Sequence, residues 1–221
     1  MTRGFKGGIC RLRDVVCAAA GLAILSPLLA VIALAIKFQD GGPVFYSQWR
    51  VGRRFRPFRL YKVRSMVVGA DRLGRPLTAP QDSRLTPLGP LLRRYKLDEL
   101  PQLLNVLKGD MQMVGARPEV DRYVSLFPEE YSTLLRDRPG ITDPASVAYR
   151  HEDQLFRSGD VEKEYIERIL PAKLKISLDY ACCRSLASDL MVILSTLFGA
   201  TCLVDRVCMS MAKSRAAQIH T

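Results

Sequence analysis

Two adjacent carboxylates, those of Asp98 and Glu99, could do chemistry because of the side chains that precede them in the sequence. These neighbours are the basic residues Arg93, Arg94 and Lys96. A carboxylate held among cations beside a helix N-terminus stays ionised, as a nucleophile must, and the same cations attract phosphate oxygens. The pair is therefore a candidate nucleophile in a phosphate-binding site. The alternative is a plain ion-pair network, because adjacent acids and bases occur on many solvated surfaces.

Further cations stand on either side of the pair in the sequence. Seven basic residues and no acidic one occur between Arg50 and Arg64, and this basic stretch ends in Lys62 and Arg64. Downstream, Arg117 and Pro118 follow a glycine turn. Arginine binds phosphate through paired hydrogen bonds and lysine binds it as a point charge, so both kinds of group suit a phosphate site.

A short helix and a β-hairpin would position these side chains. Pro101 fits best in the first turn of a helix and Gly109 is a typical end, so we expect a helix from near Pro101 to Lys108. Asp98 and Glu99 would then lie just ahead of its N-terminus. Residues 44–51 and 57–64 predict two strands joined by a turn at 52–54. Residues 68–90 are rich in Gly, Pro, Asp and Arg, and we expect a mobile loop there.

An apolar run without a charged residue covers residues 15–36 and is long enough to cross a bilayer. It is too long for the apolar part of a signal peptide, and a poor cleavage site follows it. Basic residues flank it on both sides, and the positive-inside rule places such flanks in the cytoplasm. Ser26-Pro27 lies at its centre, where proline breaks or bends a helix and the serine hydroxyl can bond a freed carbonyl. The run forms either two half-helices that enter and leave one face, which the charges favour, or a spanning helix with a proline kink.

The C-terminal third is amphipathic. Residues 162–170 predict a charged amphipathic helix, and residues 174–204 are broadly apolar with spaced charges. The uncharged part, residues 190–204, is shorter than the ~20 residues that cross a bilayer. We expect it to lie along the membrane surface or to pack under the domain.

Composition limits the partners and cofactors. The chain carries 33 Lys and Arg against 22 Asp and Glu, a net charge of +11, which points to phosphates, anionic lipid or nucleic acid. The sequence lacks the G-x-G-x-x-G and G-x-x-x-x-G-K-[ST] nucleotide-binding loops, and His151 and His220 are too few for a histidine metal site. The six cysteines are scattered, which is typical of reduced thiols in a cytoplasmic protein.

Ordered motifs along nearly the whole chain resemble the bacterial sugar transferases of the monotopic phosphoglycosyl transferase superfamily. The motifs are Asp40-Gly41-Gly42-Pro43-Val44-Phe45-Tyr46, Arg50-Val51-Gly52, Tyr61-Lys62-Val63-Arg64-Ser65-Met66, Thr86-Pro87-Leu88-Gly89, Leu97-Asp98-Glu99-Leu100-Pro101-Gln102-Leu103, Asn105-Val106-Leu107-Lys108-Gly109-Asp110-Met111, Arg117-Pro118-Glu119 and Arg138-Pro139-Gly140-Ile141-Thr142. The chain looks like the small form, a catalytic domain without the extra spanning helices of larger members.

The resemblance implies a reaction. Asp98 would attack the β-phosphate of a UDP-sugar, release UMP and hold the phosphosugar as a covalent acyl phosphate. A polyprenol phosphate, undecaprenyl phosphate above all, would then take the phosphosugar and give a polyprenyl diphosphate sugar, the first intermediate of a surface glycan. Mg²⁺ held through Glu99, with Asp98 nearby, would stabilise the leaving UMP. The phosphates would be bound by Lys62, Arg64, Arg93, Arg117 and Pro118.

The resemblance also implies a fold and a location. The fold would be α+β, with a re-entrant membrane helix broken at Ser26 and Pro27, a small β-hairpin, and amphipathic interfacial helices around a cytoplasmic catalytic domain. Residues 1–40 would form the membrane helix and its flank, 41–204 the catalytic domain and 205–221 a tail. The protein would be monotopic in the bacterial inner membrane, in contact with membrane lipid, with its active site on the cytoplasmic face. Nucleic acid is not expected as a partner.

Two departures from the family pattern bear on specificity, and one alternative function stays open. Ala116 stands where the family usually has Pro, and Asp143-Pro144 stand where a Gly and an apolar residue are usual. The second departure concerns donor specificity rather than the reaction class. The alternative function is non-enzymatic: a membrane-anchored basic protein that binds anionic lipid or nucleic acid through residues 50–64.

Overall fold

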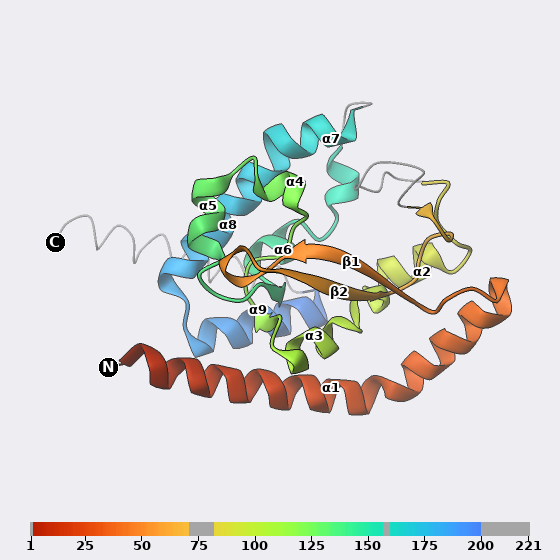
Figure 1. The fold of residues 1–221 in the computed structure, drawn as a ribbon, viewed down its shortest axis with the longest axis horizontal. Coiled ribbons are helices and arrows are strands. Elements are labelled where there is room, and N and C mark those ends of the chain that lie inside the picture. The colour runs from red at the N-terminus through yellow and green to blue at the C-terminus, as the bar shows by residue number, and fades with distance from the viewer. Residues whose placement is uncertain (1, 71–81, 157–159, 200–221) are drawn as a thin grey trace. The chain divides into compact units, whose positions relative to one another are not determined.

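A computed structural model describes residues 2–70, 82–156 and 160–199 of the chain (Figure 1). Among these residues, helices dominate and two two-stranded sheets complete the fold, which confirms the predicted mixture of helix and sheet. In chain order the elements are α1 (Thr2–Asp40), β1 (Phe45–Val51), η1 (Arg53–Phe55), β2 (Pro57–Val63), α2 (Gly89–Arg94), η3 (Leu97–Glu99), α3 (Gln102–Lys108), β3 (Gln112–Val114), α4 (Asp121–Val124), α5 (Pro128–Leu134), β4 (Gly140–Thr142), α6 (Pro144–Ala148), η4 (Glu152–Leu155), α7 (Val161–Glu164), η5 (Tyr165–Ile169), α8 (Leu170–Cys183) and α9 (Leu186–Phe198).

The chain divides into two compact units. The first comprises Met1–Arg50 and Phe58–Gly109, and the second comprises Val51–Pro57 and Asp110–Thr221. Helix α1 therefore groups with the segment that carries Asp98 and Glu99, whereas the predicted plan drew a boundary after residue 40. The predicted tail, residues 205–221, lies outside the described residues.

Helix α1 is continuous where two half-helices were predicted. Pro27 lies inside it, and Ser26 Oγ donates a hydrogen bond to the carbonyl of Ala23, 2.9 Å away. In a regular helix that carbonyl would accept from the N–H of residue 27, so the hydroxyl replaces the bond that proline removes. The proline therefore bends the helix without interrupting it, and Figure 1 shows the second half of α1 turned away from the line of the first.

A narrow stripe of α1 is buried, and most of its remaining surface is apolar and exposed. Ile32 and Ile36 lie on the buried stripe and cluster with Val63 and Leu92. The large exposed apolar side chains are Ile9, Leu12, Val16, Ile24, Leu28, Val31, Leu34 and Phe38. Water does not favour so large an apolar surface on one helix. Among the described residues, α1 alone has the length and composition of a membrane-crossing helix.

The predicted hairpin and the predicted short helix are confirmed. Strands β1 and β2 form a two-stranded sheet, and at its tip Arg54 and Phe55 both adopt positive φ angles, of 54° and 61°. Helix α3 ends at Gly109, whose φ of 91° is the left-handed conformation expected of a C-cap. Of the predicted mobile loop, residues 71–81 lie outside the described residues. Within the described part of the predicted loop, Leu85 is held in place by an antiparallel β-bridge to Met66.

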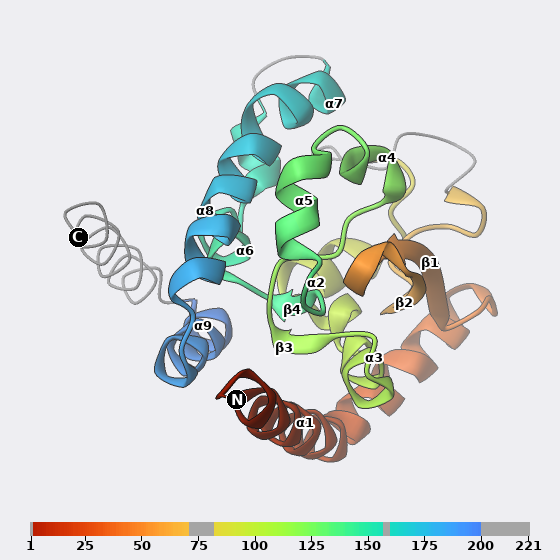
Figure 2. The ribbon, with the colours of Figure 1, turned by 60° about the vertical axis from the view of Figure 1, so that its left-hand side comes forward.

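The second unit packs helices on a short parallel sheet. Strands β3 and β4 pair with Gln112 opposite Gly140 and Val114 opposite Thr142. Val114 is buried in a cluster with Tyr180 of α8 and Val192 of α9, and α5 lies beside α8 (Figure 2). The helix predicted at 162–170 forms part of a longer helical run, in which the π-helical turn η5 connects α7 to α8.

Helix α9 covers most of the described part of the predicted apolar segment. Ser185 caps it by accepting a hydrogen bond from Ser188 N. One side of the helix is buried at Asp189, Val192 and Ser195. The other side exposes apolar residues: Leu186, Leu190, Met191, Leu194, Leu197 and Phe198. The helix is therefore amphipathic, as predicted.

Candidate active site

Asp98 and Glu99 lie in a turn that leads directly into helix α3. The 3-10 turn η3 begins after Lys96, whose φ of 57° is left-handed and turns the chain out of α2. Such a conformation is costly for a side chain with a Cβ and is found most often at functional positions. After η3 the backbone stays helical through Leu100 and Pro101 into α3. Asp98 is buried and Glu99 reaches the edge of the site.

Lys62 is the predicted cation that the structure places against this pair. Its Nζ lies 3.3 Å from Glu99 Oε1. The side chains of Lys62 and Glu99 are 22% and 12% exposed, so they form the water-facing edge of the buried Asp98. An ammonium at this place can neutralise either the dyad or an incoming phosphate.

Asn105 fixes the distance between strand β2, which carries Lys62, and helix α3. Its side chain is fully buried. Its Oδ1 accepts a hydrogen bond from Tyr61 N at 3.0 Å, and its Nδ2 donates one to the carbonyl of Arg59 at 2.7 Å. The side-chain amide of Asn105 thus bonds the backbone of β2 as a neighbouring strand would. These bonds fix the position of Tyr61 and therefore of Lys62, the next residue. Sequence reasoning did not assign Asn105 a role, although a polar residue among the apolar positions of α3 was a usable signal.

Arg11 of α1 holds the other end of α3. Its guanidinium donates to the carbonyls of Val106 at 2.6 Å and Leu107 at 3.0 Å. Carbonyls in the last turn of a helix have no partner within that helix, and a cation there also interacts favourably with the helix dipole. Helices α1 and α3 are therefore joined directly by these hydrogen bonds. Sequence analysis did not identify this contact.

Arg93 is anchored beside the dyad on helix α2. Its Nε donates to Ser65 Oγ at 3.0 Å. Helix α2 begins at Gly89, where a Cβ would come within 2.3 Å of the Ser65 carbonyl oxygen. Only glycine permits this close approach. The start of α2 therefore packs against Ser65, just after the end of β2. The positive charge of Arg93 lowers the pKa of Asp98, and phosphate binding by Arg93 stays a prediction.

Arg64 makes a different contact from the one predicted. It is buried, its Nε donates to the carbonyl of Pro43 at 2.6 Å, and its Nη1 lies 2.7 Å from Asp40 Oδ2. Its Nη2 binds the other oxygen of the same carboxylate. The guanidinium thus makes a bidentate pair with the last residue of α1. This geometry favours a positioning role, and phosphate binding by Arg64 stays a prediction.

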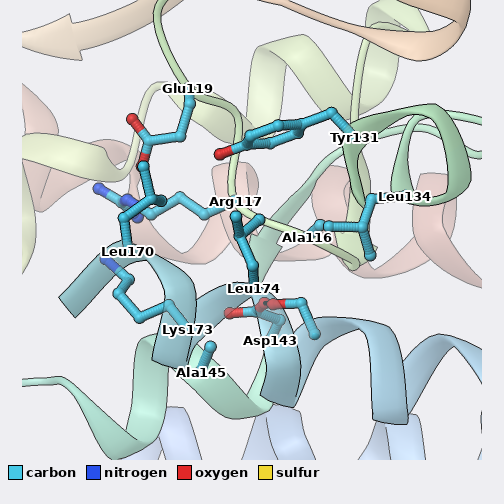
Figure 3. A pocket seen from close by; sticks show the side chains of 11 residues that line it. Ala116, Arg117, Glu119, Tyr131, Leu134, Asp143, Ala145, Leu170, Lys173 and Leu174 are labelled. Carbon is cyan, nitrogen blue, oxygen red and sulfur yellow. Dashed lines mark hydrogen bonds between the residues drawn. The ribbon is translucent and has the colours of Figure 1, made fainter. Parts of the chain in front are cut away.

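Arg117 and Pro118 belong to the second unit and are described with it. Pro118 is buried, and Arg117 lines a cavity of about 20 Å³, the size of one water molecule. Figure 3 shows the side chains of Arg117, Glu119 and Lys173 along one side of this cavity. Lys173 Nζ is paired with Glu152 at 2.8 Å, and Glu119 accepts from Tyr165 Oη at 3.0 Å. The neighbours of Arg117 around this cavity therefore include two buried charged side chains, those of Glu119 and Lys173.

The departure at Asp143 and Pro144 also has a structural explanation. Asp143 is buried, and its Oδ1 caps α6 by accepting from Ser146 N at 2.8 Å. Its Oδ2 accepts from Ser177 Oγ of α8 at 2.6 Å. Pro144 occupies the first turn of α6, which suits its missing N–H. These two residues thus begin a helix and tie it to α8.

The pKa of Asp98 is shifted in the direction opposite to the simple expectation. Burial raises the pKa of its carboxyl above the ordinary value, whereas the positive charge of Lys62 opposes that rise. Glu99 adds to the rise, and Arg93 and Lys96 oppose it. The sequence predicted a carboxylate kept ionised by its cationic neighbours. Those cations are present in the structure, but they act against a cost of burial that the sequence could not indicate.

The dyad fits a magnesium ion that arrives with a diphosphate. Asp98 Oδ1 is buried and has no hydrogen-bond partner among the described residues. Among the same residues there is no cluster of three or more His, Cys, Asp or Glu side chains that could hold a metal. Mg²⁺ commonly binds through one or two carboxylates and completes its shell with water and substrate phosphates. The two carboxylates suit that mode and not a metal site made by protein alone.

Comparison with known proteins identifies the family. Residues 5–202 match the bacterial sugar transferase family. The chain is 38% identical over 189 residues to a UDP-glucose:undecaprenyl-phosphate glucose-1-phosphate transferase of Caulobacter vibrioides, covering 84% of this chain and 67% of that protein. It is 39% identical over 139 residues to a UDP-N-acetylgalactosamine-undecaprenyl-phosphate N-acetylgalactosaminephosphotransferase of Aeromonas hydrophila, covering 62% of this chain and 33% of that protein. It is 36% identical over 162 residues to the exopolysaccharide production protein ExoY of Sinorhizobium fredii, covering 66% of this chain and 72% of ExoY. The chain belongs to the bacterial sugar transferase family.

Proposed function

We propose that the protein transfers a phosphosugar from a UDP-sugar to a polyprenol phosphate and so begins the synthesis of a surface glycan. The observation that carries the proposal is the buried Asp98 carboxylate, whose Oδ1 has no partner among the described residues. Glu99 and Lys62 lie at its edge. A buried carboxylate oxygen without a hydrogen-bond partner, close to cationic side chains, suits a nucleophile toward phosphorus. The named activities of the relatives support the same class of reaction.

The reaction would proceed in two displacements on one phosphorus atom. Asp98 attacks the β-phosphorus of the UDP-sugar, a bond forms between its carboxylate oxygen and phosphorus, and the bond to the bridging oxygen breaks. UMP leaves with the electron pair of that bond, and an aspartyl phosphosugar remains. An oxygen of the polyprenol phosphate then attacks the same phosphorus and releases Asp98. No external proton or oxidant is needed for the balance.

The neighbouring cations would neutralise charge that gathers at the phosphates. Lys62 at the edge and Arg93 beside the dyad would orient phosphoryl oxygens, and phosphate binding by Arg117 and Pro118 stays a prediction. Asp98 and Glu99 would hold Mg²⁺, which when bound neutralises diphosphate oxygens and stabilises the leaving UMP. Family membership supports this enzyme over a non-enzymatic lipid- or nucleic-acid-binding protein.

We also propose that α1 enters and leaves the membrane at its cytoplasmic face. From Arg11 to Asp40 the helix rises about 44 Å at 1.5 Å per residue, which exceeds the bilayer's hydrocarbon thickness. Yet both ends are bound by polar contacts to one compact unit, Arg11 to the carbonyls of α3 and Asp40 to Arg64. A straight span would put one of these contacts on the far side of the membrane. The bend at Pro27 and the exposed apolar face support a helix that dips into one leaflet.

The amphipathic helix α9 would lie at a membrane surface. Its exposed side carries six apolar residues, while its buried side holds Asp189 in a salt bridge with Arg184 at 2.8 Å. Apolar side chains on one side only are typical of helices that lie in the interface. An active site held at the headgroup plane can receive a soluble nucleotide sugar and a lipid phosphate.

The transferase proposal is tested by measuring UMP release. Purified full-length protein with polyprenyl phosphate, Mg²⁺ and a panel of UDP-sugars should release UMP with at least one donor, because the dyad supplies the nucleophile. EDTA should abolish the release, and excess Mg²⁺ should restore it. A folded protein that releases no UMP from any bacterial UDP-sugar would contradict the transferase. Full turnover in EDTA would contradict only the magnesium proposal.

The membrane proposal is tested by the position of the two ends of α1. Single cysteines at Thr2→Cys and Phe38→Cys, in a background from which all six native cysteines have been removed, should both react with an impermeant maleimide in inverted membrane vesicles. Neither should react in intact spheroplasts, because both ends would lie in the cytoplasm. Labelling of the two sites from opposite sides would show a spanning helix instead.

A further inference from the structure

Gln102 is a buried polar residue that neither the fold nor the proposed mechanism uses. It stands in the first turn of α3, and only 1% of its surface is exposed. Its Nε2 is buried and has no hydrogen-bond partner among the described residues. An amide N–H left in this state is costly to a fold, and it would ordinarily be replaced by an apolar side chain. A buried donor without a partner therefore points to a ligand that completes it.

The unpartnered donor follows the nucleophile by four residues, where the turn η3 leads into α3. The backbone is helical at Leu100, with φ −53° and ψ −37°, and at Pro101, with φ −63° and ψ −12°. Asp98 and Gln102 are thus four residues apart along a path that passes from a 3-10 turn into an α-helix. In an α-helix, side chains at this spacing are neighbours, so we expect these two to lie close together. Asp98 Oδ1 also lacks a partner, although an amide N–H and a carboxylate oxygen could bond each other. One buried acceptor and one buried donor, each without a partner among the described residues, are therefore four residues apart.

We propose that Gln102 Nε2 donates a hydrogen bond to a non-bridging oxygen of the phosphoryl group that Asp98 attacks. This inference rests on the proposed transferase function. The attacked phosphorus would carry its equatorial oxygens beside the carboxylate, within reach of a donor one helical turn away. Unlike Lys62, the neutral amide brings no charge that would pair with the nucleophile. Its contribution would grow as charge gathers on the phosphoryl oxygens in the transition state.

Gln102→Met is the direct test, since methionine keeps the length of the side chain and removes the donor. We expect kcat for UMP release to fall about 100-fold, with little change in KM for the UDP-sugar, as for the loss of one transition-state donor. The midpoint of thermal unfolding should stay equal or rise, because an unsatisfied buried group is removed. Leu104→Met, on the exposed side of the same helix, is the matched control and should keep wild-type kcat.

Gln102→Glu gives a second variant of the same shape. Its negative charge would repel the phosphoryl oxygens, so we expect a larger loss of kcat than with methionine. Wild-type kcat in Gln102→Met, or a kcat in Gln102→Glu above that of Gln102→Met, overturns the inference. A wild-type protein that releases no UMP instead shows the failure of the proposed function. The two failures are therefore distinguishable in one set of assays.

Discussion

Asp98→Asn should abolish turnover, lowering the rate of UMP release by at least about 1,000-fold, as is usual when a covalent nucleophile is removed. The amide keeps the shape of the side chain but cannot form the acyl phosphate. Wild-type protein mixed with the UDP-sugar alone should gain the mass of the phosphosugar, and the variant should not. Intact-protein mass spectrometry and UMP release measure the two effects. Full turnover by Asp98→Asn would refute the assignment of the nucleophile.

The same variant should be more stable than the wild type at neutral pH. Because burial raises the folded-state pKa of Asp98, the native protein binds this proton more tightly than the unfolded chain. Stability then falls as pH rises from the unfolded pKa through the folded pKa. Asparagine removes this loss, so the difference in thermal midpoint should be largest above the folded pKa and should vanish in acid. Glu129→Gln, an exposed carboxylate of α5, is the matched control and should show neither effect.

Gly140→Ala should have the largest effect on folding. A Cβ at Gly140 would come within 2.1 Å of Gly115 N and 2.5 Å of Gly115 O, both backbone atoms. Backbone in a paired strand cannot move aside as a flexible side chain can, so β3 and β4 would separate. We expect a loss of about 3 kcal/mol or more in the free energy of unfolding. For a chain of this size, that loss lowers the thermal midpoint by about 6–12 °C.

The control for this prediction is Gly8→Ala on α1. Nothing lies within 4 Å of a Cβ at Gly8, and alanine favours a helix more than glycine does. Gly8→Ala should therefore leave the midpoint equal or slightly higher. A Gly140→Ala protein that unfolds at the wild-type temperature would mean that β3 and β4 do not approach each other as closely as described.

Local features of the fold could be predicted from the sequence because their causes are local. Pro101 and Gly109 determine where α3 begins and ends through backbone conformation alone. Alternation in residues 57–64 indicates a strand because side chains of a strand alternate between its faces. The role of Ser26 is local in the same sense, since its hydroxyl bonds the carbonyl three residues earlier.

The tertiary structure decided what each charged side chain contacts. Arg64 and Lys62 are two residues apart and equally basic in the sequence, yet Arg64 binds Asp40 at the end of α1 while Lys62 contacts Glu99. The difference depends on where α1 ends against β2, which no local pattern encodes. Asn105 illustrates the same limit, because its partners lie 44 and 46 residues away in the chain.

The sequence by itself determined the family, the dyad and the membrane character of α1, because each follows from residue types at fixed spacing. Only the tertiary structure decided that Asp98 is buried, that the amide nitrogen of Gln102 is buried without a partner among the described residues, and that both ends of α1 bind one unit. Burial and pairing depend on residues brought together from distant parts of the chain. For that reason the identity of the nucleophile was a prediction from spacing, whereas the unpartnered donor of Gln102 became visible only in the fold.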